Sequence, residues 1–266
     1  MANPFSEADR PVSARQEEFL RAHHRHHHTI TFCRFFLFLL FLGIWELAAR
    51  LAWIDSFFFS SPSGILQYLH QMFADHSIYS HTGITLLETI VSFLLVTLLS
   101  LSAATLLWYF SSLSEILEPY LVVLNSLPKS ALAPLLIVWL GTVTVTIIVA
   151  GISVAVFGSI ISLYTGFCQT DPEMCKLIYT LGGNRKDALR KVILPCSIPL
   201  ILSNMKVNIG LALVGVIIGE FLAARRGLGY LIIYGSQVFQ LNMVITSIII
   251  LCAIAMIFYQ LIQRME

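Results

Sequence analysis

The chain has 266 residues, of which 57% are hydrophobic and only 12% are charged, and its net charge is +1. Soluble domains are about a quarter charged, so this composition, with a mean hydropathy of +0.82, excludes an ordinary soluble domain. The balanced charge also argues against a nucleic-acid partner. The sequence therefore predicts an all-α transmembrane protein with about six membrane-spanning helices.

Residues 1–30 are predicted to be a polar cytoplasmic tail, and residues 31–266 a single membrane domain. The tail has no apolar core followed by a cleavage site, so we expect no removable secretion signal. Its histidine cluster is typical either of a metal-binding tract or of a weakly basic tail beside the membrane, and we favour the tail. The cluster consists of His23, His24, His26, His27 and His28.

The first predicted span covers Cys33 to Trp53 and includes a possible ion pair between Glu46 and Arg50, four residues apart. Residues 54–84 contain no Lys or Arg, which favours the outer side of the membrane. A short interfacial helix is expected to begin at Ser61–Pro62. The second span, Thr85 to Trp108, contains small residues that favour close helix packing, namely Ser92, Ser100, Ser102, Ala103 and Ala104.

The third predicted span, Pro119 to Leu140, is expected to be broken, because Pro128 and Pro134 interrupt helical hydrogen bonding. Lys129 follows the first of these prolines. It is placed either at mid-depth against protein or water, or near the cytoplasmic boundary with its amine reaching the interface. The first placement makes Lys129 a candidate for a transport pathway.

Three further spans are predicted at Val143 to Phe167, Ile198 to Leu222 and Leu241 to Ile262. Glu220 lies at the outer end of the second of these, and Gly227 with Gly229 is expected to form a turn beyond it. Six spans place both termini in the cytoplasm. Arg225 and Arg226 then fall outside, against the usual charge bias, although the basic residues on the inner side outnumber them.

The segment 171–195 is the longest polar run in the second half of the chain. Asp171 can cap a helix with Pro172 in its first turn, and the glycines at 182 and 183 can end that helix. Asn184 can cap a second helix, expected to run from Arg185 to Leu194 and to end at Pro195.

Two interpretations of this segment are open from its composition. It is either an amphipathic hairpin lying on the membrane surface or a docking element for a soluble partner. In both, an apolar stripe of Leu177, Ile178 and Leu181 would anchor the first helix. The spacing of its residues favours the docking element.

The same segment resembles the cytoplasmic signature loop of bacterial ABC importer permeases, the binding-protein-dependent transport family. The pattern is a glycine, nine residues, a hydrophobe, one residue and Leu-Pro, seen here as Gly182, Val192 and Leu194–Pro195. The family's Glu-Ala-Ala positions hold Lys176, Leu177 and Ile178 here, and Glu173 is a candidate replacement for the glutamate. Residues 119–141 and 220–239 are similar to the sulfonate, nitrate and taurine branch, which also imports pyrimidine vitamin precursors.

The resemblance implies a permease subunit that binds two separate ATP-binding cassette ATPases, a second permease chain, simplest as a homodimer, and an extracytoplasmic substrate-binding protein. It implies no catalytic residue, metal or cofactor on this chain, with ATP and Mg on the ATPase. A Gly-x4-Gly-Lys-Ser/Thr phosphate loop is indeed absent from the sequence. The implied coupling residues are Glu173, Lys176, Leu181, Gly182, Gly183, Asn184, Asp187, Leu194 and Pro195, and the implied pathway residues are Pro128, Lys129 and Glu220.

The implied substrate is a small anion, such as a sulfonate, nitrate or taurine, or a pyrimidine vitamin precursor, carried across the bacterial inner membrane. The alternative is an ion-coupled secondary transporter, which would need inverted repeats and paired mid-membrane charges. Neither is clear in this sequence. An intramembrane enzyme would need a convergent catalytic set, and no such pattern lies within the predicted spans. The five cysteines include no Cys-x-x-Cys pair, so buried or reduced thiols are expected.

Overall fold

A computed structural model describes residues 30, 33–34, 36–51, 53 and 59–264, which fall into two compact units divided between Ser63 and Gly64. In the first unit, residues 36–50 are helical. Arg50 Nε lies 2.7 Å from Glu46 Oε1, which confirms the predicted ion pair, and the backbone N–H of Ser63 donates to Glu46 Oε2 at 3.1 Å. The tail 1–29, with its histidine cluster, lies outside the described residues.

The second unit is helical, and the described residues contain no strand. In chain order the elements are α3 (Pro62–Ala74, which begins in the first unit), α4 (Ser77–Tyr109), α5 (Ser111–Ser126), α6 (Lys129–Leu140), α7 (Thr144–Cys168), α8 (Pro172–Thr180), α9 (Arg185–Ala188), the π-helix η2 (Leu189–Ile193), α10 (Leu194–Cys196), α11 (Ile198–Ala223), α12 (Leu228–Gln237) and α13 (Leu241–Gln263).

Four of these helices, α4, α7, α11 and α13, are long and apolar enough to cross a membrane. The pair α5 and α6 makes a fifth candidate if it is one broken span, since its two helices are bent by 96°. These observations confirm an all-α transmembrane protein. The remaining predicted span, 33–53, includes residues outside those that the structure describes.

The break in the third span lies at Leu127–Pro128, between α5 and α6. Leu127 is extended, with φ −62° and ψ 137°, as expected for a residue before proline. The expected break at Pro134 is wrong, because Pro134 lies inside α6, and Pro119 lies inside α5 rather than at the start of a span. Membrane helices accept an internal proline where neighbouring groups satisfy the freed carbonyl.

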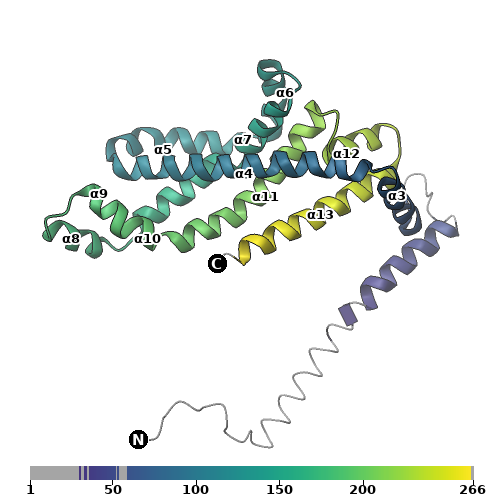
Figure 1. Cartoon of the computed structure of the whole chain (residues 1–266), viewed down its shortest axis with the longest axis horizontal. Coiled ribbons are helices and arrows are strands. Elements are labelled where there is room, and N and C mark those ends of the chain that lie inside the picture. The colour runs from purple at the N-terminus through teal and green to yellow at the C-terminus, as the bar shows by residue number, and fades with distance from the viewer. Residues whose placement is uncertain (1–29, 31–32, 35, 52, 54–58, 265–266) are drawn as a thin grey trace, which may run out of the picture. The chain divides into compact units, whose positions relative to one another are not determined.

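Helices α4, α7 and α11 form the centre of the second unit, with α7 packed against both of the others and α12 and α13 beside α11. Figure 1 shows α4 running from the end that carries α12 to the end that carries α9. We call these the α12 end and the α9 end. The buried positions of α4 recur every three or four residues, which places them on one face. That face is polar toward the α12 end and apolar toward the α9 end, and includes Thr85, Glu88, Thr89, Ser92, Val96, Ser100, Ala104 and Leu107.

Small residues bring these three helices close together, with a side chain of α4 against the backbone of α7 and the backbones of α7 and α11 in contact. A Cβ added to Gly151 of α7 would lie 2.6 Å from Ser92 Oγ of α4, and one added to Gly215 of α11 would lie 2.7 Å from Gly151 Cα. The predicted role of Ser92 in close packing is therefore confirmed. Between α7 and α11 no side chain fits at this point.

We expect Gly215→Ala to lower stability, because its Cβ would meet the backbone atoms of Gly151 and Ala150, which cannot move aside. The cost should be roughly 1–3 kcal/mol, as for other overpacked sites. The matched control is Gly210→Ala on the same helix, where a Cβ meets nothing within 4 Å. Thermal unfolding of the purified variants measures the difference. Equal melting temperatures for the two variants would contradict the close contact.

Candidate functional sites

The segment 171–195 at the α9 end, which we call the coupling segment, begins with the short helix α8. The Asp171 carboxylate accepts the backbone N–H of Glu173 at 2.9 Å, so the predicted cap is confirmed, and Pro172 lies in the first turn. Glu173 pairs with Lys176 at 2.7 Å, and both side chains are exposed. Glu173 therefore lies at the surface. That it takes the place of the glutamate in the family's Glu-Ala-Ala pattern stays a prediction.

The turn after α8 is fixed by glycine geometry. Gly182 has φ +80°, in the left-handed region that glycine accepts most readily. The backbone N–H of Gly182 donates to Tyr179 O at 3.0 Å, and that of Gly183 donates to Ile178 O at 2.9 Å, closing the end of α8. Leu181 is 76% exposed at the tip of this turn.

The second helix starts with a reciprocal cap. Asn184 Oδ1 accepts the backbone N–H of Asp187, and Asp187 Oδ2 accepts that of Asn184, both at 3.0 Å. The Asn184 N–H, with help from Lys191, holds the pKa of Asp187 below its usual value. The ionised form is therefore the one that supports the cap, and its contribution is lost as the pH falls through that lowered pKa.

This helix does not stop where the sequence predicted. After α9 the chain continues as η2, and Pro195 lies in the first turn of α10, which ends at Cys196. The expected end at Pro195 is wrong, because the helical run continues through Pro195 to Cys196. Leu194 likewise lies within the continuing helix.

The coupling segment is anchored by its second half. Val192 and Ile193 of η2 are buried, and Ile193 packs with Leu163 and Phe167 of α7 and with Ala104 of α4. The predicted anchor in α8 is wrong, because no residue of α8 is buried. Of the predicted stripe, Leu177 and the capping residue Leu181 are exposed and Ile178 is half-buried, and Met174 is exposed beside them.

Sequence reasoning missed one further contact of this segment. Arg185, held at the first position of α9 by the Asn184 cap, donates from Nη2 to Trp108 O at 2.8 Å, and its guanidinium carbon lies 5.4 Å from the Trp108 ring centroid. This joins α9 to the end of α4. The two residues are 77 positions apart, and neither lies in a recognisable local pattern.

At the α12 end, Glu220 is fully buried and holds the loop between α11 and α12. Its Oε1 accepts from Thr85 Oγ1 of α4 at 2.6 Å, and its Oε2 accepts the backbone N–H of Gly229 at 2.5 Å. Thr85 Oγ1 also accepts the N–H of Leu228 at 2.9 Å. A Cβ on Gly227 or Gly229 would lie within 2.8 Å of a Glu220 carboxyl oxygen, which explains both glycines. The pathway role predicted for Glu220 stays a prediction.

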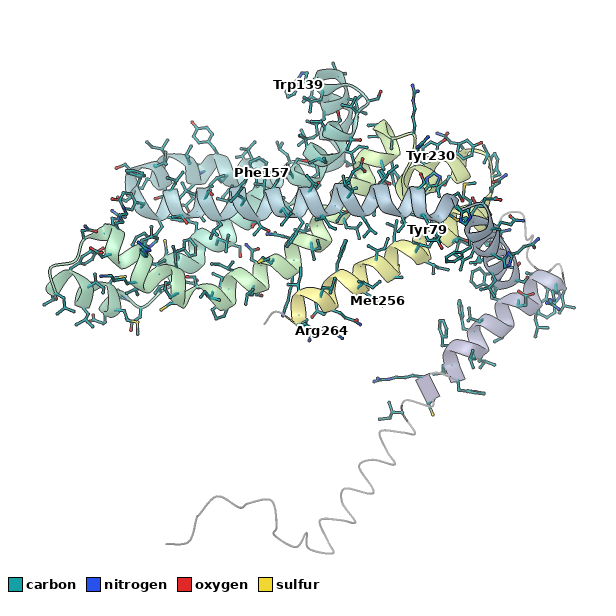
Figure 2. All side chains as sticks on the ribbon, in the orientation of Figure 1. Tyr79, Trp139, Phe157, Tyr230, Met256 and Arg264 are labelled. Carbon is teal, nitrogen blue, oxygen red and sulfur yellow. The ribbon has the colours of Figure 1, made fainter. Side chains whose placement is uncertain are left out.

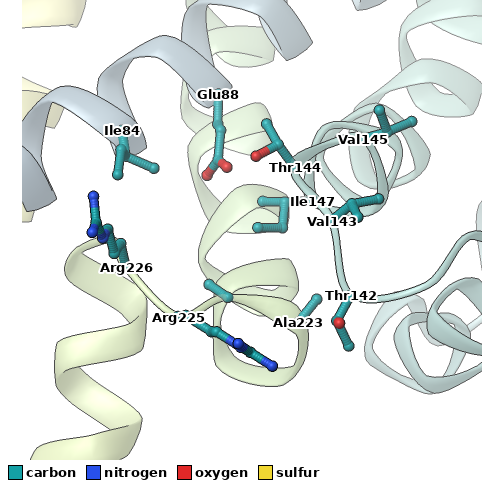
Figure 3. A pocket seen from close by; sticks show the side chains of 11 residues that line it. Ile84, Glu88, Thr142, Val143, Thr144, Val145, Ile147, Ala223, Arg225 and Arg226 are labelled. Atoms are coloured by element: carbon teal, nitrogen blue, oxygen red, sulfur yellow. The ribbon is translucent and has the colours of Figure 1, made fainter.

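A second buried acid lies next to this loop. Glu88 of α4 is 1% exposed, and its Oε2 has no hydrogen-bond partner within the described residues. It lines an open cavity of about 490 Å³ together with Thr142, Thr144 and Ile147 on one side and Arg225 and Arg226 on the other (Figure 3). Both arginines are exposed, and no carboxylate among the described residues lies within ion-pair distance of either.

The break between α5 and α6 carries the other predicted pathway residues. Pro128 is exposed and caps α6. Lys129 is half-buried, donates to Leu124 O, and places Nζ 5.2 Å from the centroid of the Phe157 ring. In Figure 2, Trp139 lies near the end of α6 that stands away from α4, and it is 70% exposed.

The sequence matches a known family of membrane transport proteins. Residues 96–265 match the family described as the binding-protein-dependent transport system inner membrane component. A probable ABC transporter permease protein of Haemophilus influenzae is 31% identical over 82% of this chain and 88% of its own length.

Two more distant relatives carry substrate names. A putative aliphatic sulfonates transport permease protein of Bacillus subtilis is 26% identical over 84% of this chain and 82% of its own length. A formylaminopyrimidine transport permease protein of Halalkalibacterium halodurans is 25% identical over 73% and 76%. The chain belongs to the family of binding-protein-dependent inner-membrane transport components, the ABC transporter permeases.

Proposed function

We propose that this chain forms the substrate pathway of an ATP-driven importer and couples to a separate ATPase through the coupling segment. The proposal rests on the geometry of the coupling segment. Its helix α8 and its glycine turn are exposed, whereas Ile193 of η2 in its second half is buried against the membrane helices. A docking element needs an open apolar face and a rigid base, and the segment has both in the open residues around Leu181 and the buried Ile193. The coupling role covers the residues predicted from the sequence, including Glu173, Lys176, Gly183 and Asp187.

The assembly that we propose contains two ATP-binding cassette subunits, which bind ATP and Mg, and two copies of this chain. The break at Leu127–Pro128 supports a second permease chain, because irregular backbone in the hydrocarbon region must be covered by protein or face a water-filled cavity. Leu127, Val138 and Trp139 are exposed around α6 in the single chain. A pathway between two copies would use this surface, with Pro128 and Lys129 in it.

The substrate that we propose is a small organic or inorganic anion or a pyrimidine vitamin precursor, delivered by an extracytoplasmic binding protein. The relatives named for sulfonates and for formylaminopyrimidine support these two classes. Lys129 would favour an anion in the pathway. Arg225 and Arg226, exposed at the α12 end, offer a basic surface to an acidic partner.

We place the protein in the bacterial inner membrane, with the α9 end and both termini in the cytoplasm. The coupling segment supports this orientation, since it carries Lys176, Arg185, Lys186, Arg190 and Lys191. Arg225 and Arg226 then lie on the outer side.

Purification in mild detergent from the native host tests the proposal. We expect an ATPase to co-purify at one copy per copy of this chain, and the reconstituted complex to take up substrate only with ATP and the binding protein. A folded, monodisperse sample without any ATPase, or uptake driven by an ion gradient alone, would overturn the proposal and favour the secondary transporter.

A further inference from the structure

Helix α4 is one unbroken rod between the two candidate sites. It runs from Ser77 to Tyr109 over 33 residues without a proline. At 1.5 Å per residue its length is about 50 Å. Figure 1 shows that it passes from the loop beside α12 to the coupling segment beside α9.

At the α9 end, the rod is tied to the coupling segment through its own terminus. The last carbonyls of a helix have no intrahelical donor, and a cation is favoured near them. Trp108 O is one of these carbonyls, and Arg185 supplies both the donor, at 2.8 Å, and the charge. The guanidinium also lies over the Trp108 ring, so a hydrogen bond and a cation–π contact both hold Arg185 at the end of α4.

At the α12 end, the rod is tied to the loop between α11 and α12 by two side chains one turn apart. Thr85 bonds both Glu220 and the Leu228 N–H, and His81 Nδ1 accepts the Gly227 N–H at 3.1 Å. Thr85 and Trp108 are 23 residues apart, roughly 35 Å along the axis. Every step between Arg185 and the loop is therefore a direct contact or one continuous helix.

We propose that α4 carries movement of the coupling segment to the α11–α12 loop, with Arg185 and Thr85 as the positioning residues at its two ends. A helix is stiff along its axis, so a displacement at Trp108 reaches Thr85 without loss in intervening joints. The packing of Ile193 with Phe167 and Ala104 holds the segment on both α7 and α4, and the Arg185–Trp108 contact adds a directed bond to the last turn of α4. The inference rests on the proposed function, because it needs an ATPase to move the segment.

The test uses the complete complex with its ATPase in membrane vesicles. All five cysteines are replaced, and a reporter cysteine is introduced as Ser236→Cys, an exposed position on α12. The rate of maleimide labelling is measured with and without ATP, beside ATP hydrolysis. In the parent we expect ATP to change the labelling rate.

Arg185→Ala should reduce that ATP-dependent change roughly 3-fold or more while the ATPase stays bound and active. The control is Arg190→Ala, which removes the same charge from the coupling segment at a residue that makes no hydrogen bond or ring contact within the described chain. Arg185→Lys keeps the positive charge but loses the planar guanidinium group, so its ATP-dependent change in labelling should lie between those of the parent and Arg185→Ala.

Thr85→Val at the far end should give the same loss, and the double variant Arg185→Ala, Thr85→Val should lose no more than either single variant, because both lie on one route. If Arg185→Ala responds to ATP as fully as Arg190→Ala, the inference is wrong while the proposed function stands. If the parent binds no ATPase and shows no response, the proposed function fails and the inference fails with it.

Discussion

Gly182→Asp is expected to abolish ATP-driven uptake and to leave the chain folded and inserted. The backbone at Gly182 is left-handed, so a side chain there costs about 1–2 kcal/mol. A Cβ would meet nothing within 4 Å, so the chain itself has room for it. The new side chain would instead project into the surface that we propose the ATPase contacts.

The loss of ATPase co-purification measures this effect, and we expect roughly a 30-fold weaker association, as for an interface residue worth ~2 kcal/mol. Gly83→Asp is the control, because a Cβ at Gly83 also meets nothing within 4 Å but the residue lies in the second turn of α4, at the opposite end of the unit. It should retain the ATPase. Equal association of the two variants would remove Gly182 from the docking surface.

Glu220→Leu is expected to cause the largest loss of stability among single changes at the α12 end. It removes both carboxyl oxygens, so the Gly229 N–H loses its acceptor in a fully buried place, and the Thr85 hydroxyl keeps only the longer bond to His81 O at 3.2 Å. The orphaned donor costs roughly 1–3 kcal/mol, so the melting temperature of the purified protein should fall by about 4 °C or more.

Glu220→Gln keeps one acceptor oxygen and nearly the same volume, and should lose roughly half as much. Thr85→Ser keeps the hydroxyl and should melt close to the parent. If the Leu, Gln and parent proteins melt together, the carboxylate does not hold the loop. The order Leu, then Gln, then parent would establish the hydrogen bonds, and not the packing alone, as the source of stability.

The local signals of this chain predicted the fold well. The Asp171 and Asn184 caps and the left-handed turn at Gly182 follow from residue types within four positions of one another. The α-helical class and the central spans follow from long apolar runs. Helix ends were less certain, since α4 begins eight residues before the predicted Thr85.

The contacts that give the candidate sites their geometry could not be predicted in the same way. Thr85 and Glu220 are 135 residues apart, so no local pattern brings them together. The amphipathic stripe of α8 was visible in the sequence, but a stripe does not say what covers it. The structure leaves Leu177 exposed and places the anchor in η2, whose π-helical turn has no signature in the sequence.

The contact of Gly215 with Gly151 also limits how this domain can change shape. Two helices that touch backbone to backbone have little room to move against one another, so this contact opposes sliding of α7 along α11. In the importer that we propose, we expect rearrangement at seams where side chains separate the helices. The α5–α6 pair is bent by 96° and has only Ser114 and Ala133 buried among its residues, so few contacts within the single chain oppose its movement.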